Sequence, residues 1–201
     1  MTSPIERLRR WLEDAKQGEP FEADSMVLAT VSAEGGPSAR VVSCRGIDES
    51  GVRFFTHYEA RKAVELAENP GAAIVFFWPT LRRQVRIEGR VEKLPAAESD
   101  AHFAARPRER QLTTWASPQS RPIDDLDALR ARIRALDEQY RGRLIPRPSS
   151  WGGYLLRPHS IEFFVSAPDR VHDRRLFVRE APPGAPQGVS DEVWSESRLA
   201  P

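Results

Sequence analysis

The sequence predicts an α+β fold in which antiparallel strands form a closed or split barrel with helices packed around it. About seven or eight short apolar or alternating segments have the character of strands. Several of them are joined by tight turns, such as residues 33–36 and 48–51, which favours antiparallel pairing. Helical segments are inserted between these strands and no internal repeat divides the chain. We therefore expect a single domain over residues 1–201.

The N-terminal part, residues 1–20, is expected to form a helix. Ser3 suits the N-cap, Pro4 the first helical position and Glu6 the closing of a capping box. An apolar face follows at helical spacing, formed by Ile5, Leu8, Trp11, Leu12 and Ala15. Strands are then predicted over residues 26–31, 38–44 and 52–56, because apolar and β-branched residues lie there between turns.

The middle of the chain predicts three more helices and two strands. A helix over residues 60–68 ends at Asn69-Pro70-Gly71, and residues 72–78 are almost entirely apolar, as in a central strand. Residues 83–94 alternate between polar and apolar side chains, as in a strand with two different faces. A helix begins at Pro95 and ends near residue 105. Another covers residues 124–140, with an apolar stripe formed by Leu126, Leu129, Ile133 and Leu136.

The C-terminal part predicts strands over residues 151–156, 161–165 and 174–179. Residues 181–190 are rich in proline and glycine and are expected to form a mobile loop before a last segment at 193–199.

The overall charge argues against a nucleic-acid partner. Thirty basic residues face 29 acidic ones, so the net charge is +1 and no general polyanion binding is expected. No apolar stretch is long enough to cross a bilayer, and the N-terminus has no apolar signal region. The single cysteine, Cys44, cannot form an intramolecular disulfide, which fits a reducing compartment. We expect a cytoplasmic protein with no membrane partner.

Several kinds of chemistry find no support in the sequence. It has no glycine-rich phosphate loop and no Gly-x-Ser-x-Gly nucleophile motif. Its four histidines do not have the spacing of metal ligands, so no metal site is expected. Cys44 lies within a predicted strand, where a buried and inert thiol is favoured over a reactive one.

The run Arg170-Val171-His172-Asp173-Arg174 is the most informative feature of the chain. Charged side chains are costly to place beside apolar strands unless they bind something. In an extended segment Arg170, His172 and Arg174 would share one face, which would suit an anionic or electron-rich ligand. The alternative is a charged hairpin turn between two strands.

Basic residues also stand at strand ends and at a helix start. Arg40 is expected to begin a strand and Arg45 to end it, and Arg61-Lys62 fall in the first turn of a helix. Cations at a helix N-terminus oppose the helix dipole, whereas an anion bound there would be favoured. Each could be an ordinary solvated charge; together they indicate a site for a phosphorylated ligand.

A series of short motifs occurs in a fixed order, and the chain resembles the pyridoxamine 5′-phosphate oxidases, FMN enzymes with a split-barrel fold. The resemblance extends from Met26 to Pro201. The motifs that carry it are residues 54–56, 60–62, 83–85, 106–108, 117–120, 148–154, 161–163 and 170–174. No single motif is specific, but all of them in this order make a specific signal.

The resemblance implies an FMN site in the interface of a homodimer. Arg40, Arg61 and Lys62 would hold the FMN phosphate, and Gln84 would hydrogen-bond to the flavin ring. Gln119, Ser120 and Arg174 would come from the other subunit. Residues expected to line the ring and the ribityl chain are Val41, Val42, Ser43, Cys44, Phe55 and Thr56. Arg170 and His172 would face the substrate.

The implied chemistry is a two-electron oxidation with O2 as acceptor. The cofactor carries the redox step, and the protein supplies position and electrostatics. Arg170 could stabilise developing negative charge, and His172 could orient the substrate or accept a proton. Orientation is the favoured role for His172, because loss of a hydride from an amine needs no strong base.

The positions that would bind the substrate depart from the family's pattern. The family has Lys, Tyr, Arg and Ser where this chain has Arg45, His102, Arg106 and Arg110. Phe164 replaces a tryptophan that contacts FMN, which removes an indole N–H donor.

Three interpretations of the function therefore remain. In the first two, the substrate is an anionic molecule that contains a ring. The arginines could bind the phosphate of pyridoxamine or pyridoxine 5′-phosphate. They could instead bind the carboxylate of a reduced phenazine, as in the phenazine-biosynthetic FMN oxidases, because guanidinium groups bind carboxylates bidentately. The third interpretation is a flavin-binding split-barrel protein without turnover, which the presence of both Arg170 and His172 disfavours.

Overall fold

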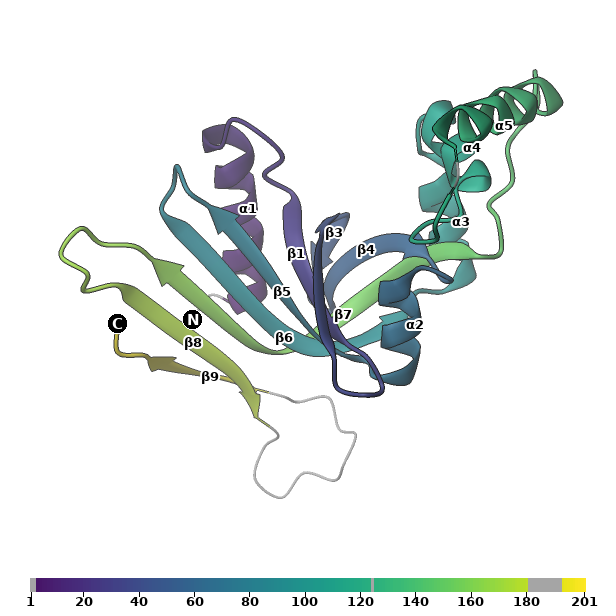
Figure 1. The fold of residues 1–201 in the computed structure, drawn as a ribbon. Helices are drawn as coiled ribbons and strands as arrows, with labels where there is room; N and C mark the ends of the chain where they lie inside the picture. Colours follow the sequence, from purple (N-terminus) through teal and green to yellow (C-terminus); the bar gives the residue numbers. More distant parts are fainter. Residues whose placement is uncertain (1–2, 124, 181–192) are drawn as a thin grey trace.

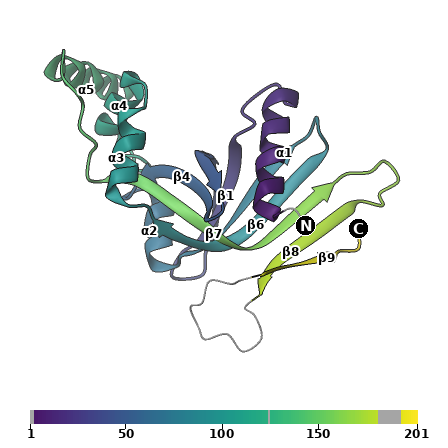
Figure 2. The same ribbon diagram turned by 180° about the vertical axis from the view of Figure 1, so that it is seen from behind.

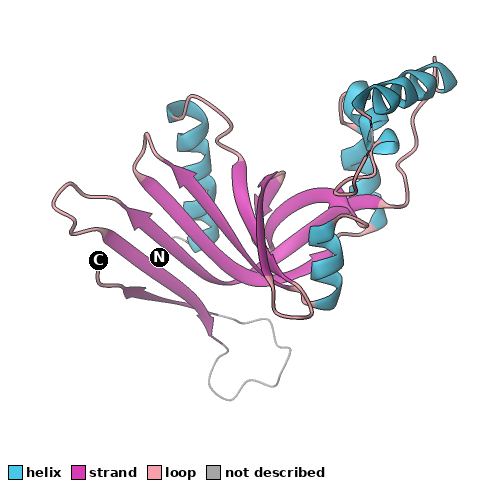
Figure 3. Cartoon of the chain, viewed as in Figure 1, coloured by secondary structure: helices cyan, strands magenta, loops and turns pink. Residues whose placement is uncertain are grey.

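The computed structural model describes residues 3–123, 125–180 and 193–201. Its strands form one curled, antiparallel sheet with helices at its ends and on one side (Figure 1; Figure 3), which confirms the split-barrel α+β fold. The strand order is β2-β1-β5-β6-β7-β4-β3, with β8 paired to β7 and β9 paired to β8. The loop expected over residues 181–190 lies outside the described residues.

The N-terminal half follows the predicted order. It comprises α1 (Pro4–Gly18), β1 (Ser25–Val31), β2 (Pro37–Ser43), β3 (Gly46–Asp48), β4 (Gly51–His57), α2 (Arg61–Glu68) and β5 (Gly71–Trp78). Ser3 caps α1, since its Oγ accepts a hydrogen bond from the N–H of Ile5 at 3.2 Å. β5 pairs with β1 on one side and with β6 on the other, so its central position is confirmed. The short strand β3 was not predicted.

The C-terminal half comprises β6 (Arg83–Lys93), α3 (Ala96–Ala104), α4 (Arg108–Ala116), α5 (Leu126–Gln139), β7 (Trp151–Val165), β8 (Asp173–Glu180) and β9 (Val193–Arg198). Helix α4 was not predicted. The apolar stripe of α5 is only half-buried or exposed: Ile133 and Leu136 pack against a small cluster that contains Phe103 and Trp151, while Leu126 is exposed.

The two strands expected at 151–156 and 161–165 are one long strand, β7. Between the two predicted strands lies Pro158, which cannot donate a ladder hydrogen bond. In the structure, the register shifts between Glu88 and Gly89: Glu88 pairs with Ser160, and Gly89 pairs with Pro158. A bulge thus leaves one extra residue on β7, which accommodates the proline without ending the strand.

Strand β7 organises the whole sheet. Its first half pairs with β4, its second half pairs with β8, and β6 runs along both. The main core lies between the curled sheet and α1, where Trp11 meets Phe163 edge-on at 5.0 Å between ring centroids. None of the described helices is long and apolar enough to cross a membrane.

Candidate functional site

A cavity of about 730 Å³ lies between β2, β4, the first turns of α2 and the helices α3 and α4. Most of the residues proposed for the cofactor and the substrate line it. They are Arg40, Val41, Val42, Ser43, Arg45, Phe55, Thr56, Lys62, His102, Arg106, Arg110 and Gln119. The structure thus brings together side chains from five separate segments of the chain.

Glu65 on α2 organises the charges at one end of this cavity. Its side chain is 5% exposed and pairs with the guanidinium groups of Arg40 at 3.2 Å and Arg61 at 2.8 Å. Burial alone would raise the pKa of Glu65, but hydrogen bonds from Thr30, Ser38 and Arg61 and the charge of Arg40 outweigh it and lower the pKa to about 2. Glu65 is therefore ionised throughout the neutral range.

Lys62 presents a buried cation to the same end of the cavity. It is 8% exposed, and its Nζ donates to Thr56 Oγ1 at 3.2 Å. Burial, and then the charge of Arg40, lowers the pKa of Lys62. Within the described part of the chain, this is the one hydrogen bond of an ammonium group that has three donors. The remaining donors and the neighbouring arginines suit a phosphate group.

Gln119, which we expected to come from a second subunit, lies on the wall of the cavity of its own chain. Its Oε1 accepts a hydrogen bond from Thr56 Oγ1 at 2.8 Å and one from the N–H of His57 at 3.4 Å within the same chain. Thr56, Lys62 and Gln119 therefore form one hydrogen-bonded group on one wall. Ser120 follows in a turn with a left-handed backbone (φ 69°) and does not line the cavity.

Aromatic rings form the wall at the other end. The rings of Phe55 and His102 stack with centroids 3.7 Å apart, and Trp151 stacks on Phe55 at 5.4 Å. Arg106 lies over the Trp151 ring at 4.8 Å and donates to Thr114 Oγ1 at 2.6 Å. These contacts fix His102 and Arg106 before any ligand arrives.

This end of the cavity is strongly basic. Burial, and then the charges of Arg106 and Arg45, lowers the pKa of His102, so its imidazole is neutral at pH 7. Arg45 pairs with Asp24 at 2.8 Å, and Arg110 adds a further exposed cation to the lining. The arrangement can bind an anion through guanidinium forks next to a neutral hydrogen-bonding ring.

A second group of proposed residues lies in register across three strands. Gln84 on β6 pairs directly with Phe164 on β7, which pairs in turn with Arg174 on β8. Directly paired residues in a sheet share one face. The His172 ring lies 4.9 Å from the Phe164 ring, and Arg174 is held by Glu162 at 2.8 Å.

The charged run forms the turn of the β7–β8 hairpin and the start of β8, as its simpler interpretation held. Arg170 has a left-handed backbone (φ 65°), which a non-glycine residue adopts at a cost and which is often found at functional sites. His172 Nδ1 accepts a hydrogen bond from the N–H of Ala167 at 3.1 Å, across the turn. This bond leaves Nε2 of the ring to meet a ligand.

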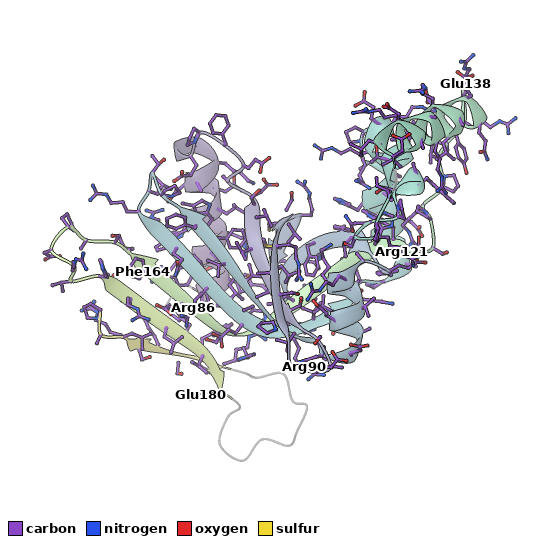
Figure 4. All side chains as sticks on the ribbon, viewed as in Figure 1. Arg86, Arg90, Arg121, Glu138, Phe164 and Glu180 are labelled. Carbon is purple, nitrogen blue, oxygen red and sulfur yellow. The ribbon has the colours of Figure 1, made fainter. Side chains whose placement is uncertain are left out.

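The two groups lie apart within one chain. The β7–β8 hairpin projects away from α3, α4 and α5 in both views (Figure 1; Figure 2). Figure 4 shows Phe164 near that hairpin and Arg121, close in sequence to Gln119, at the opposite side of the molecule. One chain therefore carries two groups of proposed site residues that it does not itself bring together.

Two other proposed residues lie outside the cavity. Cys44 is buried in the main core, and its Sγ donates to the carbonyl of Gly46 at 3.7 Å. Burial raises the pKa of this thiol to about 11, which agrees with an inert cysteine. Arg61 is exposed, pairs with Glu65 and does not line the cavity.

The structure adds lining residues that the sequence did not single out, among them His57 and Trp151. Neither Glu65 nor Asp24, which hold proposed cationic residues, was predicted. The spacing of Arg61 and Glu65, four residues apart on a helix, was the one available signal for Glu65. Within the described residues there is no cluster of three or more side chains that could hold a metal ion.

Two family models match most of the chain. Residues 12–140 match the family model for pyridoxamine 5′-phosphate oxidase. Residues 151–201 match that for the C-terminal dimerisation region of pyridoxine 5′-phosphate oxidase.

Curated relatives match over almost the whole chain. The pyridoxine/pyridoxamine 5′-phosphate oxidase of Salinibacter ruber is 46% identical over 199 residues, covering 98% of this chain and 89% of the relative. The oxidase of the same name from Burkholderia cenocepacia is 48% identical over 198 residues, with the same coverage of both chains.

Solved structures show the same fold. PhzG from Burkholderia lata, in complex with tetrahydrophenazine-1-carboxylic acid, has a TM-score of 0.90 and 32% identity, covering 100% of this chain and 94% of its own. An FMN-binding protein from Nostoc punctiforme has a TM-score of 0.77 at 19% identity, covering 100% of both chains. The chain belongs to the pyridoxamine 5′-phosphate oxidase family of oxidoreductases.

Proposed function

We propose that this protein is an FMN-dependent oxidase that converts pyridoxamine or pyridoxine 5′-phosphate to pyridoxal 5′-phosphate, with O2 as electron acceptor. The observation that carries the proposal is one cavity with two cationic ends, one at Arg40 and Lys62 and the other at Arg45, Arg106 and Arg110. A phosphorylated cofactor and a phosphorylated substrate each need such an end. Relatives 46–48% identical with this activity in their names support the assignment.

The residues at the first end fit the phosphate of FMN. Lys62 offers buried donors. Arg40 and Arg61, which both pair with the Glu65 carboxylate, add positive charge beside them. Thr56 and Gln119 supply polar atoms on the adjoining wall. When bound, FMN would supply the two-electron acceptor chemistry that no side chain of this protein provides.

A homodimer would complete the site. We infer that Gln84, Phe164 and Arg174 of one subunit approach the cavity of the other, since one chain holds these groups apart (Figure 4). The match of residues 151–201 to a dimerisation region supports this arrangement, because that region contains β7, β8 and β9.

The substrate would lie between the two half-sites. Its phosphate would bind to Arg45, Arg106 and Arg110, with neutral His102 as a further hydrogen-bonding partner. Arg170 and His172 of the second subunit would face the reacting carbon, with the ring of His172 oriented by its bond to Ala167. Arg170 would stabilise developing negative charge, and His172 would orient the substrate.

A second substrate remains a candidate because of the same arginines. Three guanidinium groups would also bind the carboxylate of a reduced phenazine, and PhzG, whose complex holds such a molecule, is 32% identical over the whole chain. The higher identity to the vitamin B6 oxidases favours the phosphate ester.

Oxygen consumption decides between these substrates. Purified protein loaded with FMN should consume O2 with pyridoxamine 5′-phosphate or pyridoxine 5′-phosphate, and much more slowly with a dihydrophenazine carboxylate. Faster turnover of the dihydrophenazine would reverse the order of the two candidates. Protein that takes up FMN but consumes no O2 with any of the three would contradict the proposed function.

A further inference from the structure

A buried carboxylate lies beside the groups proposed to bind the FMN phosphate, where a negative charge should oppose an anion. Glu65 is 5% exposed and lies on α2, one helical turn after Arg61. Since the proposed cofactor is anionic, the negative charge of Glu65 would repel it, and the presence of a carboxylate here requires another explanation. We propose that Glu65 is a positioning residue that fixes the guanidinium groups of Arg40 and Arg61 for the phosphate; this rests on the proposed function.

The carboxylate cannot turn away from these partners. Its Oε2 accepts hydrogen bonds from Thr30 Oγ1 at 2.5 Å, Ser38 Oγ at 2.7 Å and Arg40 at 3.2 Å. Its Oε1 accepts from Arg61 Nε at 2.8 Å. Four donors from two strands and the helix itself therefore hold one side chain in one orientation.

The hydrogen bond to Glu65 orients the guanidinium group of Arg61. Its side chain is 66% exposed, so without a partner it would sample many rotamers. The bond to Glu65 uses Nε, on the inner edge of the guanidinium group, and no hydrogen bond within the described residues uses its two terminal nitrogens. Glu65 thus orders an exposed arginine with its terminal donors still available for a phosphate.

Arg40 is held more completely. Its two terminal nitrogens donate to the carbonyl of Leu28 at 3.2 Å, to Thr30 at 2.5 Å, and to Ser38 and Glu65. It contributes a fixed positive charge on the wall of the cavity rather than a mobile one. Fixed charges need no reorganisation when an anion binds, which favours affinity.

Two flavins that differ only in the phosphate test this role. In Glu65→Gln, we expect FMN to bind to the apoprotein about 5- to 30-fold more weakly, since roughly one to two ordered side chains are released. Riboflavin, which lacks the phosphate, should bind as it does to the unaltered protein. Both dissociation constants are measured by quenching of flavin fluorescence on titration with apoprotein.

Glu68→Gln is the matched control, because it removes the same charge from an exposed position on the same helix. It should leave both flavin affinities unchanged. Equal or tighter FMN binding by Glu65→Gln would overturn the proposal and make the carboxylate a competitor of the phosphate. An equal loss for both flavins would also overturn it, since that result indicates a structural role alone.

A milder variant keeps the test decisive if Glu65→Gln does not fold. Ser38→Ala removes one hydrogen bond from Glu65 and one from Arg40. It should weaken FMN binding about 2- to 5-fold, as expected for roughly one hydrogen bond, and leave riboflavin binding unchanged; unchanged FMN binding would count against the proposal. Failure of the unaltered protein to bind FMN would instead contradict the proposed function itself.

Discussion

Asp24 forms an ion pair at 2.8 Å with Arg45, a residue that lines the cavity, so the guanidinium group proposed to bind the substrate already has an anionic partner. Both side chains are about one-third exposed, at 31% and 35%. A substrate anion must therefore share or displace the Asp24 carboxylate. A partly exposed pair of this kind is worth about 0.2–1 kcal/mol.

Asp24→Asn should accordingly lower KM for pyridoxamine 5′-phosphate by about 1.5- to 5-fold, the equivalent of that pair energy. The value of kcat and the affinity for FMN should not change, because the ion pair of Asp24 is with Arg45 and not with Arg40, Arg61 or Lys62, the residues proposed to bind the FMN phosphate. Arg45→Ala is the opposite control and should raise KM. A higher KM in Asp24→Asn would mean that Asp24 holds Arg45 in place for the substrate.

The lowered pKa of His102 predicts a pH-dependent contribution to stability. The unfolded chain takes up a proton near the ordinary histidine pKa of 6.5, whereas burial and the charges of Arg106 and Arg45 oppose protonation in the folded state. The unfolded state therefore binds more protons just below pH 6.5, and the free energy of unfolding falls as the pH is lowered.

Replacing this histidine should reduce that pH dependence. His102→Phe keeps an aromatic ring to stack on Phe55 and removes the titrating group. Urea unfolding at pH 5.5, 6.5 and 7.5 should show a smaller loss of stability toward low pH in the variant than in the unaltered protein. Since His57 is present in both proteins, its own lowered pKa cancels in the comparison. Identical pH dependence would contradict the assignment.

The close packing at the bulge in β7 predicts that Gly89 cannot be replaced by a larger residue without loss of stability. A Cβ on Gly89 would overlap the backbone carbonyl of Arg157 and lie 2.8 Å from Leu156, at the point where the register shifts. Gly89→Ala should lower the free energy of unfolding by about 1–3 kcal/mol, because the backbone must move. Gly46→Ala is the control, since its Cβ would lie 3.6 Å from the flexible Arg53 side chain. Equal stability of the two variants in urea would contradict this explanation.

The sequence predicts the elements whose signals are local. The apolar face of α1, the apolar β5 and the alternation of β6 were each visible, because capping and periodicity depend on neighbouring residues. Strand β7 was divided wrongly because Pro158 is tolerated only through a bulge against a partner that lies 69 residues earlier. Helix α4 begins after Pro107 without a side-chain cap, just as α3 begins after Pro95, so the proline was an available start signal that our prediction did not use.

The sequence predicted which residues line the candidate site better than it predicted the hydrogen bonds and ion pairs between them. Motifs identified Arg40, Lys62 and Arg106, which the structure places in one cavity. They could not show that Glu65 joins Arg40 to Arg61, since the hydrogen bonds come from strands 25 to 35 residues away. They also assigned Gln119 to a second subunit, although its bond to Thr56 lies within one chain.

The division of the site into two half-sites predicts complementation between inactive variants. Arg106→Ala alters the cavity of its own chain, and Arg170→Ala alters the β7–β8 hairpin. If each complete site takes its cavity from one subunit and its hairpin from the other, a mixed dimer of the two variants has one site with both defects and one site with none. Random exchange of subunits makes about half of the dimers mixed, so about one quarter of the normal activity should return.

The experiment mixes the two purified variants, allows subunit exchange under mild denaturant and follows O2 consumption with pyridoxamine 5′-phosphate. Each variant taken alone through the same exchange is the control and should stay at its low starting rate. If both half-sites came from one chain, every site in the mixture would carry a defect and no activity would return. Recovery of activity would therefore show that each site is built from two subunits, and its absence would show that each site is built within one chain. The experiment needs no structure of the dimer.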